Sequence, residues 1–144
     1  MTPLVSSKNI TRYIPQKAPI IMVGELMSND ENQTVSRLNI EAKNIFCTDG
    51  LFMEPGLIEN IAQTAALRMG YTASQKEGNE KAPKGFIGAV SKLKVHGFPK
   101  VGDTLETTVD IKNEIFGIIL IQGTSRVNGE VMAECEMKIF VEDE

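Results

Sequence analysis

The sequence has little of what metal sites, disulfide frameworks and membrane spans are made from. It contains one histidine, two cysteines and no apolar run long enough to cross a bilayer. Cys47 and Cys135 lie far apart and lack metal-ligand spacing, so we expect free thiols in a reducing cytoplasm, with no metal and no cofactor. The stretch Met1–Lys8 also lacks the apolar core of a signal peptide.

Basic residues are scarce as well. The chain carries 15 Lys and Arg against 19 Asp and Glu, a net charge of −4, and no dense basic stripe, which argues against nucleic acid as a partner. An acidic carrier protein would need a local basic patch, which Lys92, Lys94 and Lys100 could supply. The length of 144 residues and the 42% hydrophobic content predict one globular domain over residues 1–144.

The clearest element is a long helix from Met53 to Gly70. Pro55 suits the first turn, and Gly70 can end the helix in a left-handed conformation. One side is apolar, and the other carries Leu67 among the polar residues Glu59, Asn60 and Gln63. Two interpretations remain open. The polar residues form a solvated stripe, or the helix is wrapped by sheet or by a second subunit and Glu59 is partly dry.

Strands dominate the rest of the chain. A short helix at 8–14 and a proline-bounded turn at 15–19 precede them, and 72–84 is a polar connecting loop. Strands are predicted at 20–23, 34–40, 85–95, 105–111, 116–127 and 131–141, with a hairpin at Asn128-Gly129. Alternation in the last strand places Cys135 in the core. One helix laid across an antiparallel sheet covers its apolar face, so we expect an α+β fold.

Four short segments, in this order and spacing, resemble a known family. They are Ile14–Val23, Pro55-Gly56 followed by Glu59 and Ala62-Gln63, Phe86-Ile87-Gly88, and Val101–Leu105. The chain resembles the hotdog-fold 3-hydroxyacyl-acyl-carrier-protein dehydratases, and among them a divergent dehydratase-like branch. The resemblance implies a hotdog fold, with a long central helix wrapped by an antiparallel sheet. It also implies a homodimer or higher assembly whose sheets join, with an acyl tunnel between the central helices.

The resemblance also implies a site. Glu59 takes the place of the family's catalytic carboxylate, and the Gly56 and Leu57 amides would polarise the thioester carbonyl at the helix start. Gln63 would hold Glu59, and Gly88 is a further substrate-binding position. The family's histidine, from a Gly-His-Phe-Pro-Gly segment, falls on Cys47, or on Ile45 if the alignment is made on Glu59.

The histidine is therefore missing. The family's other histidine, in the early turn, is Gln16 here, and His96 is expected to be a surface or strand residue. A Cys47 thiolate could act as the base, but a thiol pKa of about 8.5 leaves little thiolate at neutral pH. The alternative is that Cys47 is a packed thiol in a loop.

Three functions remain open. The first is a dehydratase acting on 3-hydroxyacyl thioesters of acyl carrier protein or CoA, in fatty-acid or polyene-type lipid biosynthesis, with Glu59 and Cys47 as its catalytic residues. The second is an acyl thioesterase, which needs no histidine. The third is a non-catalytic acyl-binding subunit that forms a heterodimer with an active, related dehydratase.

Overall fold

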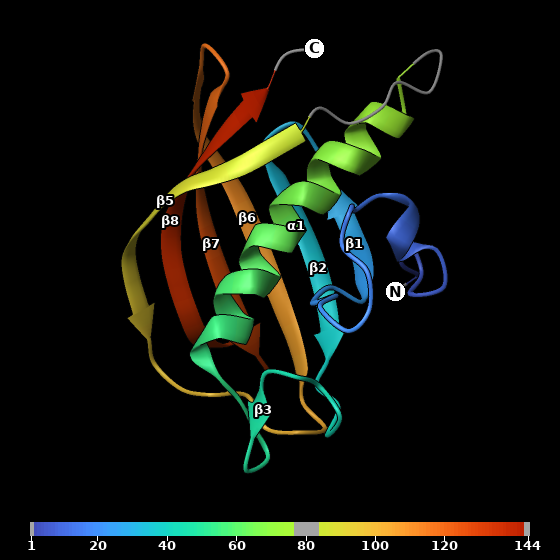
Figure 1. Cartoon of the computed structure of the whole chain (residues 1–144), viewed down its shortest axis with the longest axis vertical. Helices are drawn as coiled ribbons and strands as arrows, with labels where there is room; N and C mark the ends of the chain where they lie inside the picture. The colour runs from blue at the N-terminus through green and yellow to red at the C-terminus, as the bar shows by residue number, and fades with distance from the viewer. Residues whose placement is uncertain (1, 77–83, 143–144) are drawn as a thin grey trace.

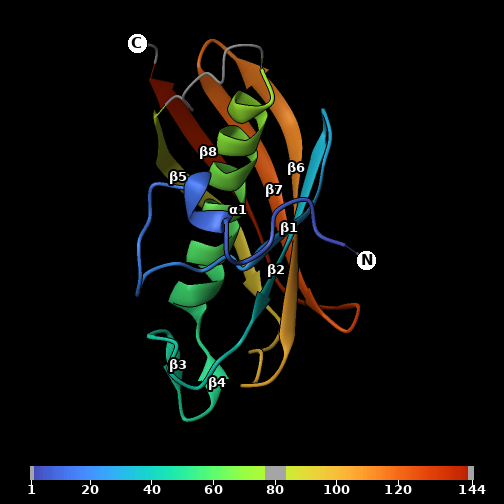
Figure 2. The same cartoon turned by 90° about the vertical axis from the view of Figure 1, so that its right-hand side faces the viewer.

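The structure is a computed structural model that describes residues 2–76 and 84–142. Helix α1 (Glu54–Ser74) lies along one face of a six-stranded antiparallel sheet, as Figures 1 and 2 show from two sides. The sheet order is β1-β2-β6-β7-β8-β5, so β1 and β5 are its edges. Its strands are β1 (Glu25–Asn29), β2 (Gln33–Asn39), β5 (Lys84–Val95), β6 (Thr104–Ile115), β7 (Ile118–Val127) and β8 (Glu130–Glu142). The predicted α+β architecture is confirmed.

The smaller elements lie beside this layer pair. A short hairpin of β3 (Cys47–Thr48) and β4 (Leu51–Phe52) leads into α1, and a 3-10 helix, η1 (Ile10–Arg12), lies near the chain start. The helix predicted over 8–14 is therefore shorter than expected. The hairpin turns at Asp49-Gly50, where both residues have positive φ.

The core forms on the sheet face toward which every second side chain of the strands points. In β8 the side chains of Ala133, Cys135 and Met137 are buried toward α1, while Lys138 on the other face is exposed. Cys135 is 1% exposed, as predicted. The alternation buries one sheet face against the helix and leaves the other to solvent. Leu57, Ile61 and Leu67 of α1 are fully buried, although they do not lie on one narrow stripe.

Two turns set the register of the long strands. Asn128 and Gly129 have φ values of 50° and 83°, which confirms the hairpin between β7 and β8. The strand predicted from Phe116 begins at Ile118 instead, because Phe116 and Gly117 themselves have positive φ and turn the chain between β6 and β7.

The end of α1 differs from the prediction. The helix continues past Gly70 to Ser74, so Gly70 is not a terminator and residues 72–74 are not loop. Gly70 is instead a close packing contact, because a Cβ there would overlap the backbone carbonyl of Tyr13. The remaining predicted loop residues 77–83 lie outside the described part of the chain.

The strand predicted over residues 20–23 is also wrong. This segment is an extended strap that crosses α1 outside the sheet, with Met22 and Val23 buried. Its backbone groups bond to helix side chains rather than to a neighbouring strand. The strap needs no partner strand because the side chains of Asn60 and Gln63 bond to its backbone. Both side chains are fully buried, so the interpretation of them as part of a solvated stripe is wrong.

Candidate active site

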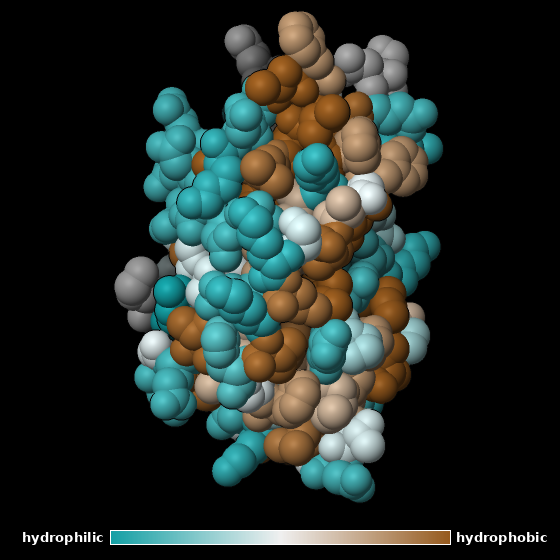
Figure 3. Space-filling model, turned by 90° about the vertical axis from the view of Figure 1, so that its left-hand side faces the viewer, coloured by the Kyte–Doolittle hydropathy of each residue, from teal (hydrophilic) through white to brown (hydrophobic). Residues whose placement is uncertain are grey.

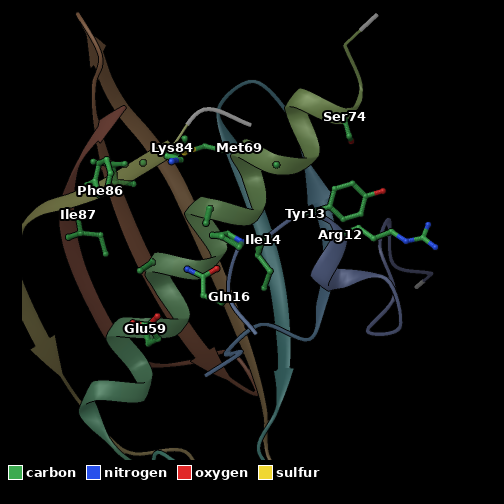
Figure 4. A pocket seen from close by; sticks show the side chains of 16 residues that line it. Arg12, Tyr13, Ile14, Gln16, Glu59, Met69, Ser74, Lys84, Phe86 and Ile87 are labelled. Carbon is green, nitrogen blue, oxygen red and sulfur yellow. The ribbon is translucent and has the colours of Figure 1, made fainter. Parts of the chain in front are cut away.

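A cavity of about 850 Å³ runs along α1. Its walls are the helix, the segment Arg12–Gln16 and the first residues of β5, as the close view in Figure 4 shows. On the helix, Ala62, Ala66 and Gly70 follow one another at intervals of one turn. Their small side chains keep the helix surface low, and Met69, Ile87 and Ile139 supply apolar walls. Such a trough suits a hydrocarbon chain.

Glu59 lies on the cavity wall toward the start of α1 (Figure 4). Among the lining residues that the structure describes, it is the only carboxylate, and none is a histidine or a cysteine. Its side chain is half-buried, and its Oε1 accepts a hydrogen bond of 3.0 Å from Gln63 Nε2. The arrangement places one oriented acid beside an apolar chamber.

Gln63 joins the helix to the strap. Its Oε1 accepts a 2.6 Å hydrogen bond from the Met22 amide, and its Nε2 donates to the Ile20 carbonyl at 2.7 Å as well as to Glu59. Asn60 adds a 2.7 Å bond from its Nδ2 to the Met22 carbonyl. The buried side-chain amide of Gln63 therefore bonds to backbone groups of the strap that have no partner strand, and it also orients the Glu59 carboxylate.

Asn60 is held in turn by the sheet. The Thr107 hydroxyl donates to Asn60 Oδ1 and lies 2.9 Å from the Ser125 hydroxyl, so the polar chain reaches β6 and β7. All three side chains are fully buried. A buried network whose members are bonded fixes rotamers, which gives the strap and Glu59 a rigid support.

The other predicted binding residues lie apart from the cavity walls. The amides of Gly56 and Leu57 both donate to the Met53 carbonyl, at 3.0 and 3.2 Å, and Gly56 packs against Phe52. Gly88 lies in β5, where its missing side chain leaves room for the Phe140 ring. None of the three lines the cavity. Their roles in substrate binding stay predictions.

Cys47 and His96 are also absent from the described lining of the cavity that contains Glu59. Cys47 is half-buried in β3, its thiol donates to the Glu41 carbonyl at 3.6 Å, and burial raises its pKa. A raised pKa reduces the thiolate fraction that a catalytic base needs. His96 is exposed just after the end of β5, and its Nε2 lies 3.2 Å from Glu134 Oε2. A catalytic role for Cys47 stays a prediction, and His96 is a surface residue as expected.

The sequence analysis did not predict that Arg12, Gln16 and Lys84 line the cavity. Arg12 and Lys84 lie in the half of the cavity away from Glu59, and Gln16 lies in the half toward it (Figure 4). Gln16 was recognised only as the replacement of a family histidine. The signal for the cavity was the turn-by-turn spacing of Ala62, Ala66 and Gly70.

Within the described residues, no three His, Cys, Asp or Glu side chains lie close enough together to hold a metal ion. In the same residues, α1 is too polar to cross a bilayer, and no other helix is long enough.

A helix lying across a six-stranded antiparallel sheet, with a carboxylate on the helix beside an apolar cavity, defines the class of hotdog-fold dehydratase-like proteins. A family model described as ApeP-like, ApeP dehydratase, matches residues 8–144, and the chain belongs to this family. The predicted recognition, a divergent dehydratase-like branch, is confirmed.

Individual relatives agree with this assignment. The chain is 24% identical to a 3-hydroxyacyl-[acyl-carrier-protein] dehydratase FabZ of Anaeromyxobacter sp. (strain K), over 98% of this chain and 93% of the relative. It is 23% identical to the FabZ of Rickettsia massiliae, over 97% and 98%. Both alignments span nearly the whole of each chain, so the likeness is not confined to one motif.

Solved structures share the fold. The dehydratase heterocomplex ApeI:P from Xenorhabdus doucetiae matches with a TM-score of 0.83 at 14% identity, over 100% of this chain and 93% of that one. A hypothetical thioesterase with coenzyme A from Streptococcus pneumoniae matches with a TM-score of 0.68 at 12% identity, over 83% and 86%. The predicted hotdog fold is confirmed, and the chain is a dehydratase-like hotdog protein.

Proposed function

We propose that this chain is a subunit of a dehydratase that removes water from 3-hydroxyacyl thioesters. The observation that carries the proposal is Glu59, a single oriented carboxylate on the wall of an apolar cavity. In the reaction a base removes a proton from C2, the C3–oxygen bond breaks, a proton reaches the departing hydroxyl, and a C2–C3 double bond forms. We assign Glu59 to one of the two proton transfers.

The second acid–base group comes from a related hotdog subunit in this proposal. The cavity contains no histidine or cysteine among its described lining residues, and burial raises the pKa of Cys47 rather than lowering it. The solved relative with a TM-score of 0.83 is a dehydratase heterocomplex, which supports a partner of this kind. A heterodimer would complete a site that one chain leaves half built.

The place for the partner is the edge strand β5. Nothing in the described chain pairs with its outer edge, and Phe86, Ile87 and Val90 are all exposed there, Phe86 by 58%. Figure 3 shows a largely hydrophobic band running along this side of the molecule. An unpaired strand with exposed apolar side chains is a template for pairing with a second sheet. Because the first residues of β5 also line the cavity, a partner bound there would lie beside Glu59.

The proposal also concerns the molecule that carries the acyl group. The FabZ relatives are named for acyl-carrier-protein substrates, and we propose the same carrier here. Lys94 and Lys100 are exposed and suit an acidic carrier, whereas Lys92 lies 3.3 Å from Glu136. The two free cysteines fit a reducing cytoplasm, where we place the reaction.

The test is the Glu59→Gln variant, assayed for turnover of a 3-hydroxyacyl carrier protein together with the partner subunit. The amide keeps an oxygen that can accept the Gln63 hydrogen bond, so the fold should be unchanged while turnover falls by at least about a hundredfold. Glu54→Gln is the matched control, because Glu54 is exposed at the first turn of the same helix and does not line the cavity. Undiminished turnover in Glu59→Gln would contradict the proposal.

A second candidate is a thioesterase. One structural neighbour is described as a hypothetical thioesterase with coenzyme A, and a lone carboxylate is enough to activate a water molecule against a thioester. Release of free thiol from an acyl thioester, lost in Glu59→Gln, would support this candidate. Absence of thiol release over a range of acyl lengths would exclude it.

A further inference from the structure

Four strands share a row of exposed apolar side chains on the sheet face that is turned away from α1. Phe86 pairs with Phe140, Phe140 with Ile118, and Ile118 with Ile115, in register across β5, β8, β7 and β6. Phe140 alternates with Ile139, which is buried toward α1, so the row lies on the outer face. The four side chains of the row are between 39% and 58% exposed.

Phe116 extends this apolar surface at the turn between β6 and β7, which lies at the same end of the sheet as the C-terminus in Figure 1. Its side chain is 100% exposed, and φ is 47° at Phe116 and 79° at Gly117. A two-residue hairpin turn with positive φ at both positions is best made by Asn-Gly, and a bulky aromatic residue is unfavourable there. Neither the turn nor the solvent favours this ring, which indicates a contact outside the folded chain.

The five residues together form what we call the outer patch: Phe86, Ile115, Phe116, Ile118 and Phe140. Its three phenylalanines expose roughly 400 Å², taking about 200 Å² for a whole aromatic side chain. With the two isoleucines, the outer patch reaches the upper end of the range of about 300–600 Å² that monomeric proteins leave exposed. Two such patches in contact would bury on the order of 1,000 Å², the least that a specific interface requires.

We infer that the outer patch binds the outer patch of a second copy of this chain, sheet against sheet. The part of the row on β5 and β8 is aromatic, and the part on β6 and β7 is aliphatic. A two-fold axis along the strands therefore places the aromatic part of each copy on the aliphatic part of the other. Lys138 and Glu142, two residues to either side of Phe140, are exposed and give the apolar centre a polar rim, as interfaces have.

This contact goes beyond the proposed function and does not depend on it. The outer patch lies on the sheet face opposite α1, so a copy bound there leaves the cavity along the helix open. It also uses side chains of the sheet face rather than the backbone edge of β5, so the edge stays available for a partner strand. A membrane surface fits less well than a second copy, because the net charge of −4 opposes binding to anionic lipid.

The test is the mass of the full chain, measured by sedimentation velocity over a range of concentrations. The double variant Phe116→Asn/Ile118→Thr suits the local structure, because Asn-Gly is the preferred pair for this turn and threonine is favoured in strands. At high concentration the wild type should be about twice as heavy as the double variant, and dilution should bring both to one mass. Phe116→Asn alone should raise the dissociation constant at least about tenfold, since a central aromatic ring is a typical binding hot spot.

Ile45→Thr is the matched control, because Ile45 is also exposed, receives the same substitution and lies outside the outer patch. It should keep the mass of the wild type. Urea unfolding at low concentration separates assembly from folding: Phe116→Asn should be at least as stable as the wild type, because the turn is improved. Equal masses for the wild type and the double variant at every concentration would overturn the inference, as would the same fall in mass for Ile45→Thr. A less stable Phe116→Asn would also overturn it, since the ring would then serve the fold itself.

Discussion

The side-chain amide of Gln63 bonds to the strap and to Glu59, and Gln63→Met tests what these bonds contribute to stability. The substitution preserves length and burial but removes three hydrogen bonds, those to the Met22 amide, the Ile20 carbonyl and Glu59. The strap has no strand neighbour that could replace them, so two backbone groups lose their partners. At about 1–2 kcal/mol for each unpaired group, the free energy of unfolding should fall by about 2–4 kcal/mol.

The assay is urea unfolding at one fixed protein concentration, because any assembly would otherwise shift the midpoint. The midpoint should fall with the slope unchanged, since the surface exposed on unfolding is the same. Gln33→Met is the matched control: Gln33 also bonds through its Nε2, to Asp110 at 2.8 Å, but it is exposed. It should cost no more than about 0.5 kcal/mol. Equal midpoints for the two variants would refute the stabilising role of the Gln63 hydrogen bonds.

Two further predictions concern packing and pH. Gly70→Ala should destabilise by about 1–3 kcal/mol despite the better helix propensity of alanine, because the new methyl group would overlap the rigid Tyr13 backbone. Gly88→Ala should cost less, since only the half-exposed Phe140 ring must move; a larger loss for Gly88→Ala in urea unfolding would contradict this packing. Burial raises the pKa of Cys135 from 9.0 to about 11. The unfolded chain therefore releases this proton first, so stability is full below pH 9.0 and falls as the pH rises toward 11. Cys135→Ala should weaken that decline in unfolding measured across this range, and an identical decline would argue against a buried thiol.

Much of the fold follows from local signals in the sequence. The alternation around Cys135 and the Asn128-Gly129 pair suffice for the last hairpin, because strand period and turn chemistry act between near neighbours. The central helix was predictable for the same reason. Its end was not, because Gly70 is used for contact with Tyr13, which lies far away in the sequence.

The site depended on contacts that no local pattern contains. The helical period placed Asn60 and Gln63 opposite the apolar arc, where a polar residue usually meets water. Their amides instead bond a strap that comes from residues 20–22, and this tertiary contact buries them. Glu59 was predictable only through the resemblance of its helix to a family. Gln16 could not be predicted as a cavity residue, because it comes to line the cavity only through the tertiary packing of residues 12–16 along the helix.

The most direct measurement of the central claim is the mass of a 3-hydroxyacyl carrier protein after incubation with this chain and its hotdog partner. The account predicts that the carrier loses one water with the wild type and keeps its mass with Glu59→Gln. Loss of the whole acyl group would indicate a thioesterase. An unchanged carrier over several acyl lengths, with the partner present, would contradict a catalytic role for Glu59.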